Sequence, residues 1–169
     1  ALNEINEIKK GDGTPFKVFT PFWRTAEKFY IEKIPSREKM IKKCKKKITY
    51  FKNCVEPEQI LPKKKWFKNF EKLWSPDEES AFKELKNFIK DRVINYSEAR
   101  NFPSRIGTSK LSPFIKFGQI HVETIWNECR KKKPKNLGIS KFLAEIGWRE
   151  FNHSLINHFP HMLKSNYSK

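Results

Sequence analysis

The chain has 169 residues, of which 37% are hydrophobic and 33% charged, and it contains fifteen Phe and five Trp. This is enough apolar material for the core of one domain or of parts of two, so wholesale disorder is excluded. No apolar run approaches the ~20 residues that a membrane-spanning helix needs, and no signal-peptide pattern opens the chain, so we expect no membrane partner. The net charge of +17 favours a polyanionic partner, although a Lys-rich surface is also compatible with plain solubility.

Cysteine and histidine usage argues against a metal site. The cysteines are Cys44, Cys54 and Cys129. Their odd number and the lack of a CxxC pair predict reduced thiols and a cytoplasmic protein. His153, His158 and His161 lie close in sequence, but Pro160 interrupts the helix between the last two, and no carboxylate or thiol completes a ligand set.

Residues 1–34 begin with a polar, helix-like stretch, which a turn at residues 11–13 ends. Residues 16–20 alternate and are rich in β-formers, which predicts a short strand or extended segment that Pro21 ends. Residues 35–74 contain two lysine runs and the helix breakers Pro57 and Pro62. We interpret this stretch as a connector with scattered aromatic anchors. These anchors are Tyr50, Phe51 and Trp66.

From residue 75 onward the pattern is helical. Ser75 is a good N-cap, Pro76 suits the first helical position and Glu78 completes a capping box. Apolar residues then recur at helical spacing to about Arg100. After a break at residues 101–104 and a turn at 107–109, we expect helices at about 112–117, 121–130 and 141–159. Gly118 would end the first of these three, and Ser140 would cap the last.

The first motif that carries chemistry is the segment 107–112, which combines three hydroxyl groups with Lys110 at the start of a short helix. Such a segment can hold a phosphate through hydroxyls and backbone N–H groups. The alternative is that Thr108, Ser109 or Ser112 is simply a helix cap.

The second motif is a stripe on the last helix. Residues Glu145, Trp148, Arg149 and Asn152 share one helical face. An aromatic and charged stripe suits a flat, hydrogen-bonding ligand such as a nucleobase. The alternative is a salt-bridged surface at the rim of the fold. Gly147 costs helix stability, but its lack of a side chain can admit a close neighbour.

Three blocks of the chain together resemble the DNA photolyase and cryptochrome family. Lys17–Trp23 resembles the segment that closes the family's α/β antenna domain. Tyr96–Pro103, followed by Gly107–Pro113, resembles the entry to its helical flavin domain. Phe142–Phe151, ending in His158–Pro160, resembles its lesion-pocket helix. Within the family the chain looks most like an internal part of a class I cyclobutane pyrimidine dimer photolyase.

The resemblance implies a mainly α fold in which three parts follow one another. Residues 1–34 would end the α/β antenna domain, residues 35–74 would be the interdomain connector, and residues 75–169 would be the first, incomplete part of the all-helical domain that binds flavin adenine dinucleotide (FAD). The rest of the antenna domain would precede residue 1, and the family's electron-relay tryptophans would follow residue 169. An antenna chromophore, folate or deazaflavin, would be bound outside this chain.

The resemblance also implies roles for single residues. The FAD contacts would be Tyr96, Thr108, Ser109, Lys110, Leu111, Ser112 and Phe142. The DNA contacts would be Arg100, Glu145, Trp148, Arg149 and Asn152, of which Glu145 and Trp148 would also be catalytic. The chain departs from the family pattern at four positions. Lys110 stands where Arg is frequent, Phe142 where Trp is frequent, Asn152 where an aromatic residue is found, and His121 where Ser is usual.

The implied activity is light-driven repair of cyclobutane pyrimidine dimers in DNA by electron transfer from reduced FAD. The enzyme would be a monomeric carbon–carbon lyase, and this chain alone is expected to be inactive. Two alternatives stay open: a cryptochrome-like photoreceptor that keeps the flavin without repair, and a non-catalytic, basic module that binds nucleic acid.

Overall fold

A computed structural model of the chain describes residues 1–4, 6–30, 60, 62–70, 72–132 and 136–167. The chain divides into two compact units. Ala1–Lys33 and Asp77–Lys169 form the larger unit, and Ile34–Pro76 forms the smaller one. The described residues contain helices and turns but no strand, so the expected mainly α class is confirmed.

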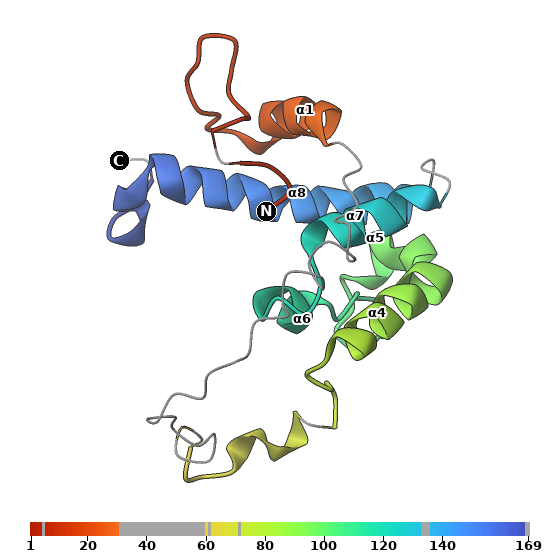
Figure 1. Cartoon of the computed structure of the whole chain (residues 1–169). Coiled ribbons are helices and arrows are strands. Elements are labelled where there is room, and N and C mark those ends of the chain that lie inside the picture. Colours follow the sequence, from red (N-terminus) through yellow and green to blue (C-terminus); the bar gives the residue numbers. More distant parts are fainter. Residues whose placement is uncertain (5, 31–59, 61, 71, 133–135, 168–169) are drawn as a thin grey trace, which may run out of the picture. The chain divides into compact units, whose positions relative to one another are not determined.

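The larger unit is organised around α8 (Leu137–His158), a helix of 22 residues. Its buried residues come in pairs that repeat every four positions, so they form a stripe that winds slowly around the helix and meets several neighbours in turn. It contacts α1 (Phe19–Phe29), the 3₁₀ turn η3 (Val93–Asn95), α5 (Tyr96–Ala99), α7 (Val122–Lys131) and η4 (Pro160–Leu163). Figure 1 shows α8 as the long helix that runs across the unit, with α1 on one side of it.

An aromatic cluster joins α1 to α8. Phe22 is 1% exposed, and its ring centroid lies 5.2 Å from that of Phe151. Trp23 packs against the backbone of Gly147, where an added Cβ would lie only 2.2 Å from two ring atoms. The same indole contacts the buried Trp126 of α7 at 5.6 Å between centroids. Gly147 therefore does admit a close neighbour, and this neighbour comes from α1.

The N-terminal segment differs from the expected strand. Residues 16–18 are irregular and α1 begins at Phe19, so Pro21 lies in the first turn of a helix. Proline is tolerated there because the first N–H groups of a helix have no partner within it. The turn at residues 11–13 is confirmed, whereas the described residues before it form no helix.

The helical stretch after residue 77 is less regular than the spacing predicts. α4 (Glu78–Asn87) continues into the π-helical segment η2 (Phe88–Arg92), and η3 and α5 follow. The N-cap is Asp77 rather than Ser75, because the Asp77 carboxylate accepts a hydrogen bond from the Ser80 N–H at 2.6 Å. The expected capping box from Ser75 to Glu78 is therefore wrong by two residues.

The remaining helices fall near their expected positions. α6 spans Ser112–Lys116, and Gly118 follows it with a φ of 72°, as expected for a residue just past a helix end. α7 begins after His121. α8 begins at Leu137, earlier than expected, because the side chain of Asn136 accepts hydrogen bonds from two backbone N–H groups. Ser140 lies inside the helix and is not its cap.

In the smaller unit the structure describes residues 60, 62–70 and 72–76. They include one 3₁₀ turn, η1 (Trp66–Asn69), in which Trp66 and Phe70 pack edge to face at 5.8 Å. The aromatic anchors expected at Tyr50 and Phe51, as well as Cys44 and Cys54, lie outside the described residues. The expected antenna-domain tail at 1–34 and connector at 35–74 stay predictions.

Within the part of the chain that the structure describes, no helix is both long and apolar enough to cross a membrane.

Replacing Gly147 with Ala tests the contact between α1 and α8. Alanine normally stabilises a helix interior relative to glycine. Here its Cβ would overlap the Trp23 ring, so we expect the free energy of unfolding to fall by about 1–3 kcal/mol, the usual cost of overpacking. Urea titration followed by circular dichroism measures the change. Gly11→Ala is the control, since no atom lies within 4 Å of its added Cβ. Equal stability of the two variants would contradict the packing.

Candidate functional site

An ion pair between α5 and α8 lies at the centre of the predicted site. Arg100, the C-cap residue of α5, donates a hydrogen bond from Nη1 to Oε1 of Glu145 on α8. Both side chains remain about one-third exposed, at 32% and 37%. The hydrogen bond raises the pKa of the Arg100 guanidinium above its ordinary value. Because solvent screens the pair, its contribution to stability is about 1 kcal/mol or less. The geometry therefore favours a role in binding over one in folding.

Aromatic rings form the floor beneath this ion pair. The Arg100 guanidinium carbon lies 5.4 Å from the ring centroid of Tyr96, within the range of a cation–π contact. Tyr96 packs edge to face against Phe142 of α8 at 5.3 Å, and both contact Phe88. Burial raises the pKa of the Tyr96 phenol, which keeps it neutral. Two of the predicted FAD contacts, Tyr96 and Phe142, are thus brought together by α5 and α8.

The segment 107–112 is anchored next to Arg100. Gly107 lies against Ala99, and a Cβ on Gly107 would come within 2.6 Å of the Ala99 backbone. Leu111 is fully buried and fixes the other end of the segment. Between these anchors Lys110 adopts a left-handed φ of 55°. This conformation is uncommon for a residue other than glycine and turns the chain sharply.

The hydroxyl groups of this segment are available to a ligand. Thr108 and Ser112 are exposed, and Ser109 is half-buried. None of them caps α6, because its N-cap is Leu111, without a side-chain cap hydrogen bond. The hydroxyl of Ser109 accepts a weak hydrogen bond from the Leu111 N–H at 3.4 Å. The helix-cap alternative is therefore wrong, and the exposed hydroxyls beside Lys110 fit the phosphate end of a dinucleotide.

Trp148 does not share the environment of Glu145. Its ring stacks on Phe19 of α1 with centroids 3.9 Å apart and an interplanar angle of 10°. The side chain is still 42% exposed. One face of the indole is therefore covered by protein. Phe19 was not expected as a partner of Trp148, because residues 16–20 were predicted to be a strand or extended segment and not the start of a helix.

The rest of the stripe is divided between solvent and a buried carboxylate. Arg149 donates from Nη1 to Oε1 of Glu150 at 2.5 Å, while Asn152 is exposed. Glu150 is only 4% exposed, and its second oxygen accepts from the Leu2 N–H at 3.1 Å. Arg149 thus compensates a buried negative charge, which would otherwise be costly. The salt-bridged alternative is correct for two residues of the stripe: Arg149 pairs with Glu150 of the same helix, and Glu145 pairs with Arg100 of α5.

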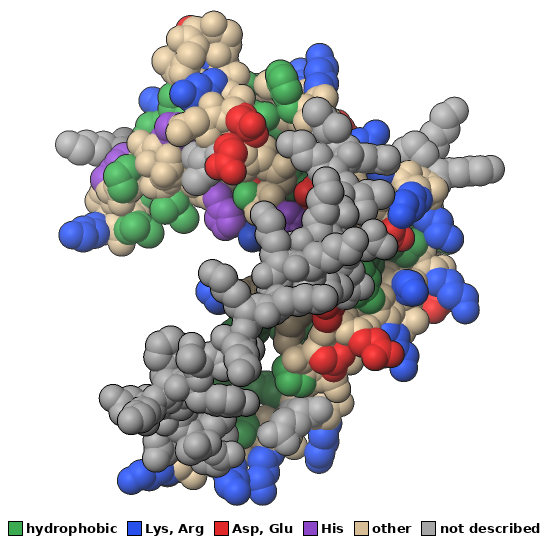
Figure 2. All heavy atoms as spheres, viewed as in Figure 1, with side chains coloured by type: hydrophobic (Ala, Val, Ile, Leu, Met, Phe, Trp, Pro, Cys, Tyr) green, Lys and Arg blue, Asp and Glu red, His purple; other side chains and the backbone are tan. Residues whose placement is uncertain are grey.

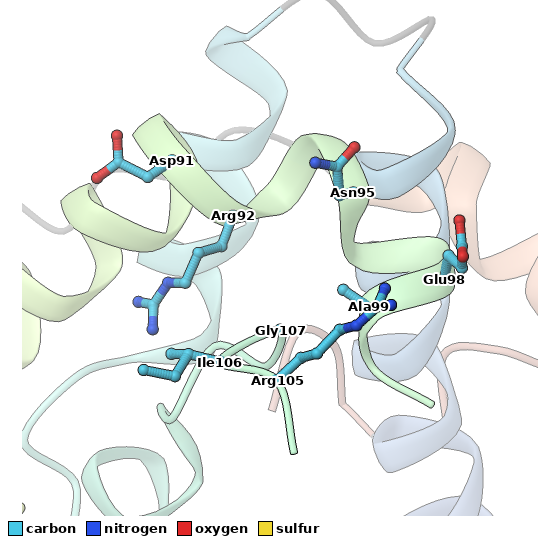
Figure 3. A pocket seen from close by; sticks show the side chains of 8 residues that line it. All are labelled: Asp91, Arg92, Asn95, Glu98, Ala99, Arg105, Ile106 and Gly107. Carbon is cyan, nitrogen blue, oxygen red and sulfur yellow. The ribbon is translucent and has the colours of Figure 1, made fainter. Parts of the chain in front are cut away.

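A pocket of about 450 Å³ is lined in part by Gly107, and the sequence did not predict it. Its lining residues are Asp91, Arg92, Asn95, Glu98, Ala99, Arg105, Ile106 and Gly107. Figure 3 shows the Arg92 guanidinium directed into this space, whereas the carboxylates of Asp91 and Glu98 point away from it. Arg92 is already paired with Glu84 at 2.5 Å. Because Glu84 already neutralises the guanidinium that enters it, the pocket by itself indicates no class of ligand.

Comparison with known proteins gives a consistent result. No family model matches the chain. It is 32% identical to deoxyribodipyrimidine photo-lyase of Agrobacterium fabrum over 99% of its length, which is 35% of that protein. It is also 32% identical to deoxyribodipyrimidine photo-lyase of Alkalihalophilus pseudofirmus, over 89% of this chain and 31% of that one. The chain therefore spans about a third of the length of these relatives.

Among solved structures, a bacterial class III photolyase from Agrobacterium tumefaciens superposes with a TM-score of 0.78. The match covers 99% of this chain and 35% of that one, at 29% sequence identity. The class I assignment expected from the sequence finds no support, because this structural relative is a class III enzyme. The wider resemblance is confirmed by sequence and structure together: over nearly its whole length the chain is similar to members of the photolyase family.

Proposed function

We propose that this chain is part of a deoxyribodipyrimidine photo-lyase, which repairs cyclobutane pyrimidine dimers in DNA with light. The observation that carries the proposal is the joint placement of three features on α5 and α8. These are the Arg100–Glu145 ion pair, the Tyr96–Phe142 ring pair and the hydroxyl-rich segment anchored on Ala99. A charged pair for DNA thus lies next to a phosphate-holding segment. The similarity to named photo-lyases supports the same reaction.

FAD fits the segment 107–112 at its diphosphate end. Thr108 and Ser112 would donate hydroxyl hydrogen bonds to the phosphates, and Lys110 would supply positive charge as a flexible point charge. Leu111 and Gly107 would hold the segment in place through their burial. Tyr96 and Phe142 are more than 90% buried, so they would support the site from below rather than stack openly on a ring. Reduced FAD, when bound, supplies the light-driven electron for dimer splitting.

Glu145 would act on the lesion. A dimer reaches such a site by leaving the duplex, which exposes its carbonyl and imide groups to the protein. In this chain one carboxylate oxygen of Glu145 accepts from Arg100. A DNA phosphate that drew Arg100 toward itself would release this carboxylate for an imide N–H of the dimer. Glu145 would then stabilise the reacting state by a hydrogen bond in a water-poor site.

The other three residues of the stripe would contribute in different ways. Trp148 would pack against the lesion with the ring face that Phe19 leaves open. Asn152, which is exposed, would contact the DNA backbone or sugar. Arg149 would contribute less than expected, because its guanidinium is held by Glu150.

For the whole protein we propose a monomer in the cytoplasm with damaged DNA as its partner. The three-part division at residues 1–34, 35–74 and 75–169 and an antenna chromophore of the folate or deazaflavin type are part of the same proposal. The large net charge of +17 supports a DNA partner, because each phosphate that a Lys or Arg neutralises releases a counterion.

The Glu145 role is tested in the full-length protein with Glu145→Gln and Glu145→Ala. Loss of the carboxylate removes the partner of Arg100 at a side chain that is about one-third exposed, so folding and flavin content should be unchanged. Dimer affinity should fall by about 1–3 kcal/mol in the Ala variant, the cost of a buried polar group without its partner. Repair yield per absorbed photon should fall in both variants. Single-turnover photorepair of a thymine-dimer oligonucleotide, with flavin absorbance as the internal control, measures these effects.

Wild-type yield and affinity in both variants would contradict a lesion-facing role for Glu145. Such a result, with normal flavin content, would instead favour the cryptochrome-like alternative. Trp148→Phe is a matched comparison, since it keeps a ring against Phe19 and alters only the stacking area.

Flavin retention provides a separate test of the proposed site. Residues 107–112 would bind the diphosphate of FAD. The residues that contact the flavin ring are expected beyond residue 169. A purified polypeptide of residues 1–169 should therefore show no flavin absorbance. The full-length protein, purified in parallel, should be yellow. Stoichiometric flavin in the shorter polypeptide would show that residues 1–169 hold the ring as well.

A further inference from the structure

Away from the candidate site, a basic hollow lies between the α4–η2 segment and α7. It has a volume of about 360 Å³, and its lining residues are Lys86, Ile89, Lys90, Glu128, Lys131 and Lys132. Ile89 is 8% exposed and forms an apolar floor, while the four lysines are exposed around it. Figure 2 shows Lys and Arg side chains, with a few acidic ones among them, over the region of α4 and α7.

The charge of this basic hollow is poorly compensated by the residues that the structure describes. Its single acidic residue, Glu128, is paired with Lys131 at 2.5 Å. Among the described residues, no carboxylate pairs with Lys86, Lys90 or Lys132. Lys86 and Lys90 are four residues apart, a spacing at which like charges on a helical segment repel. An anion between the two segments would relieve this repulsion.

Helix-end electrostatics explain only part of the arrangement. Lys131 and Lys132 lie at the C-terminal end of α7, where cations interact favourably with the helix dipole. Lys86 lies in the last turn of α4 and Lys90 in that of η2, but the helical chain continues from α4 into η2 and then η3, so neither lies at a free helix end. The lysines of two separate segments are instead directed to one hollow by the packing of α4–η2 beside α7.

We infer that the basic hollow binds the phosphodiester backbone of duplex DNA, at a place separate from the lesion site. This goes beyond the proposed repair reaction and rests only on its DNA partner. Lysines are flexible point charges without the planar fork of arginine, so they suit phosphates and carry no base-specific readout. A membrane surface fits less well, because the rim is entirely charged and its one apolar residue is buried. The hollow therefore adds affinity for any duplex, damaged or intact.

The experiment measures binding of an undamaged duplex to the full-length protein as a function of salt. Each neutralised phosphate contributes about 0.9 to the slope of log K against log salt concentration. The variant Lys86→Ala/Lys90→Ala/Lys132→Ala should therefore have a slope that is flatter by about two to three. The matched control, Lys9→Ala/Lys28→Ala/Lys164→Ala, removes the same charge from exposed lysines on other segments and should change the slope by less than one. Replacing the three hollow lysines by Arg should preserve the wild-type slope.

An unchanged slope in the Ala variant would overturn the inference, and so would an equal loss in the control, which would indicate diffuse attraction by the net charge. Binding to vesicles with anionic lipids that depends on these lysines, with DNA binding unaffected, would also overturn it in favour of a membrane surface. Repair yield of bound dimers should be unchanged in the hollow variant. The outcome is thus independent of whether Glu145 acts on the lesion.

Discussion

The arrangement of the larger unit depends on how α8 is buried. A helix of 22 residues that is covered by α1, α5 and α7 has to offer a different kind of surface to each neighbour. Toward α1 it offers Gly147 and Trp148, which receive Trp23 and Phe19. Toward α5 it offers Phe142 and Glu145. Because interiors are close-packed, a shift of α8 would disturb both sets of contacts at once. The packing of α1 on one face of α8 therefore also helps to hold Phe142 and Glu145 in position on the other.

Two carboxylates on α8, Glu145 and Glu150, differ in burial, and this difference suits one to ligand binding and the other to stabilising the fold. Glu150 is 4% exposed and satisfied by Arg149 and the Leu2 N–H, so it serves the fold. Glu145 is about one-third exposed and is bound by Arg100, so a ligand can compete for it. The difference arises because Glu145 faces the end of the short helix α5, whereas Glu150 faces the N-terminal segment. A charge near the surface can exchange partners at low cost, while a buried one cannot.

Positive charge is the other property that connects the fold to its proposed partner. Arg100 stands beside the segment 107–112, and the lysines of the basic hollow stand between α4–η2 and α7. The first set is combined with aromatic rings and a carboxylate, which permits recognition of a particular ligand. The second consists of lysines around an apolar floor, which permits only attraction to phosphates. Specific and non-specific contacts with DNA usually depend on such a division.

The sequence by itself determined the mainly α class and the resemblance to photolyases, and it singled out Tyr96, Arg100, Phe142 and Glu145, which the structure brings together. Helical periodicity after residue 77 and the order of three motifs were sufficient, because both are properties of neighbouring residues. Sequence-based prediction failed where a local pattern is compatible with two structures. Residues 16–20 fit a strand by alternation, but Phe19, Phe22 and Trp23 also fit a helix, and only the presence of α8 selects the helix. Likewise Ser75 and Ser140 are good caps locally, yet Asp77 and Asn136 are the caps observed.

Tertiary structure alone decided which partner each site residue has. Glu145 and Trp148 share a helical face in sequence, but α5 and α1 approach that face from different directions and draw the two side chains apart. The basic hollow is also invisible in the sequence, because Lys86 and Lys132 are 46 positions apart and only the packing of two segments brings them to one place. Periodicity gives the face of a helix on which a residue lies. What that face meets depends on contacts between residues distant in the chain, and those follow from packing.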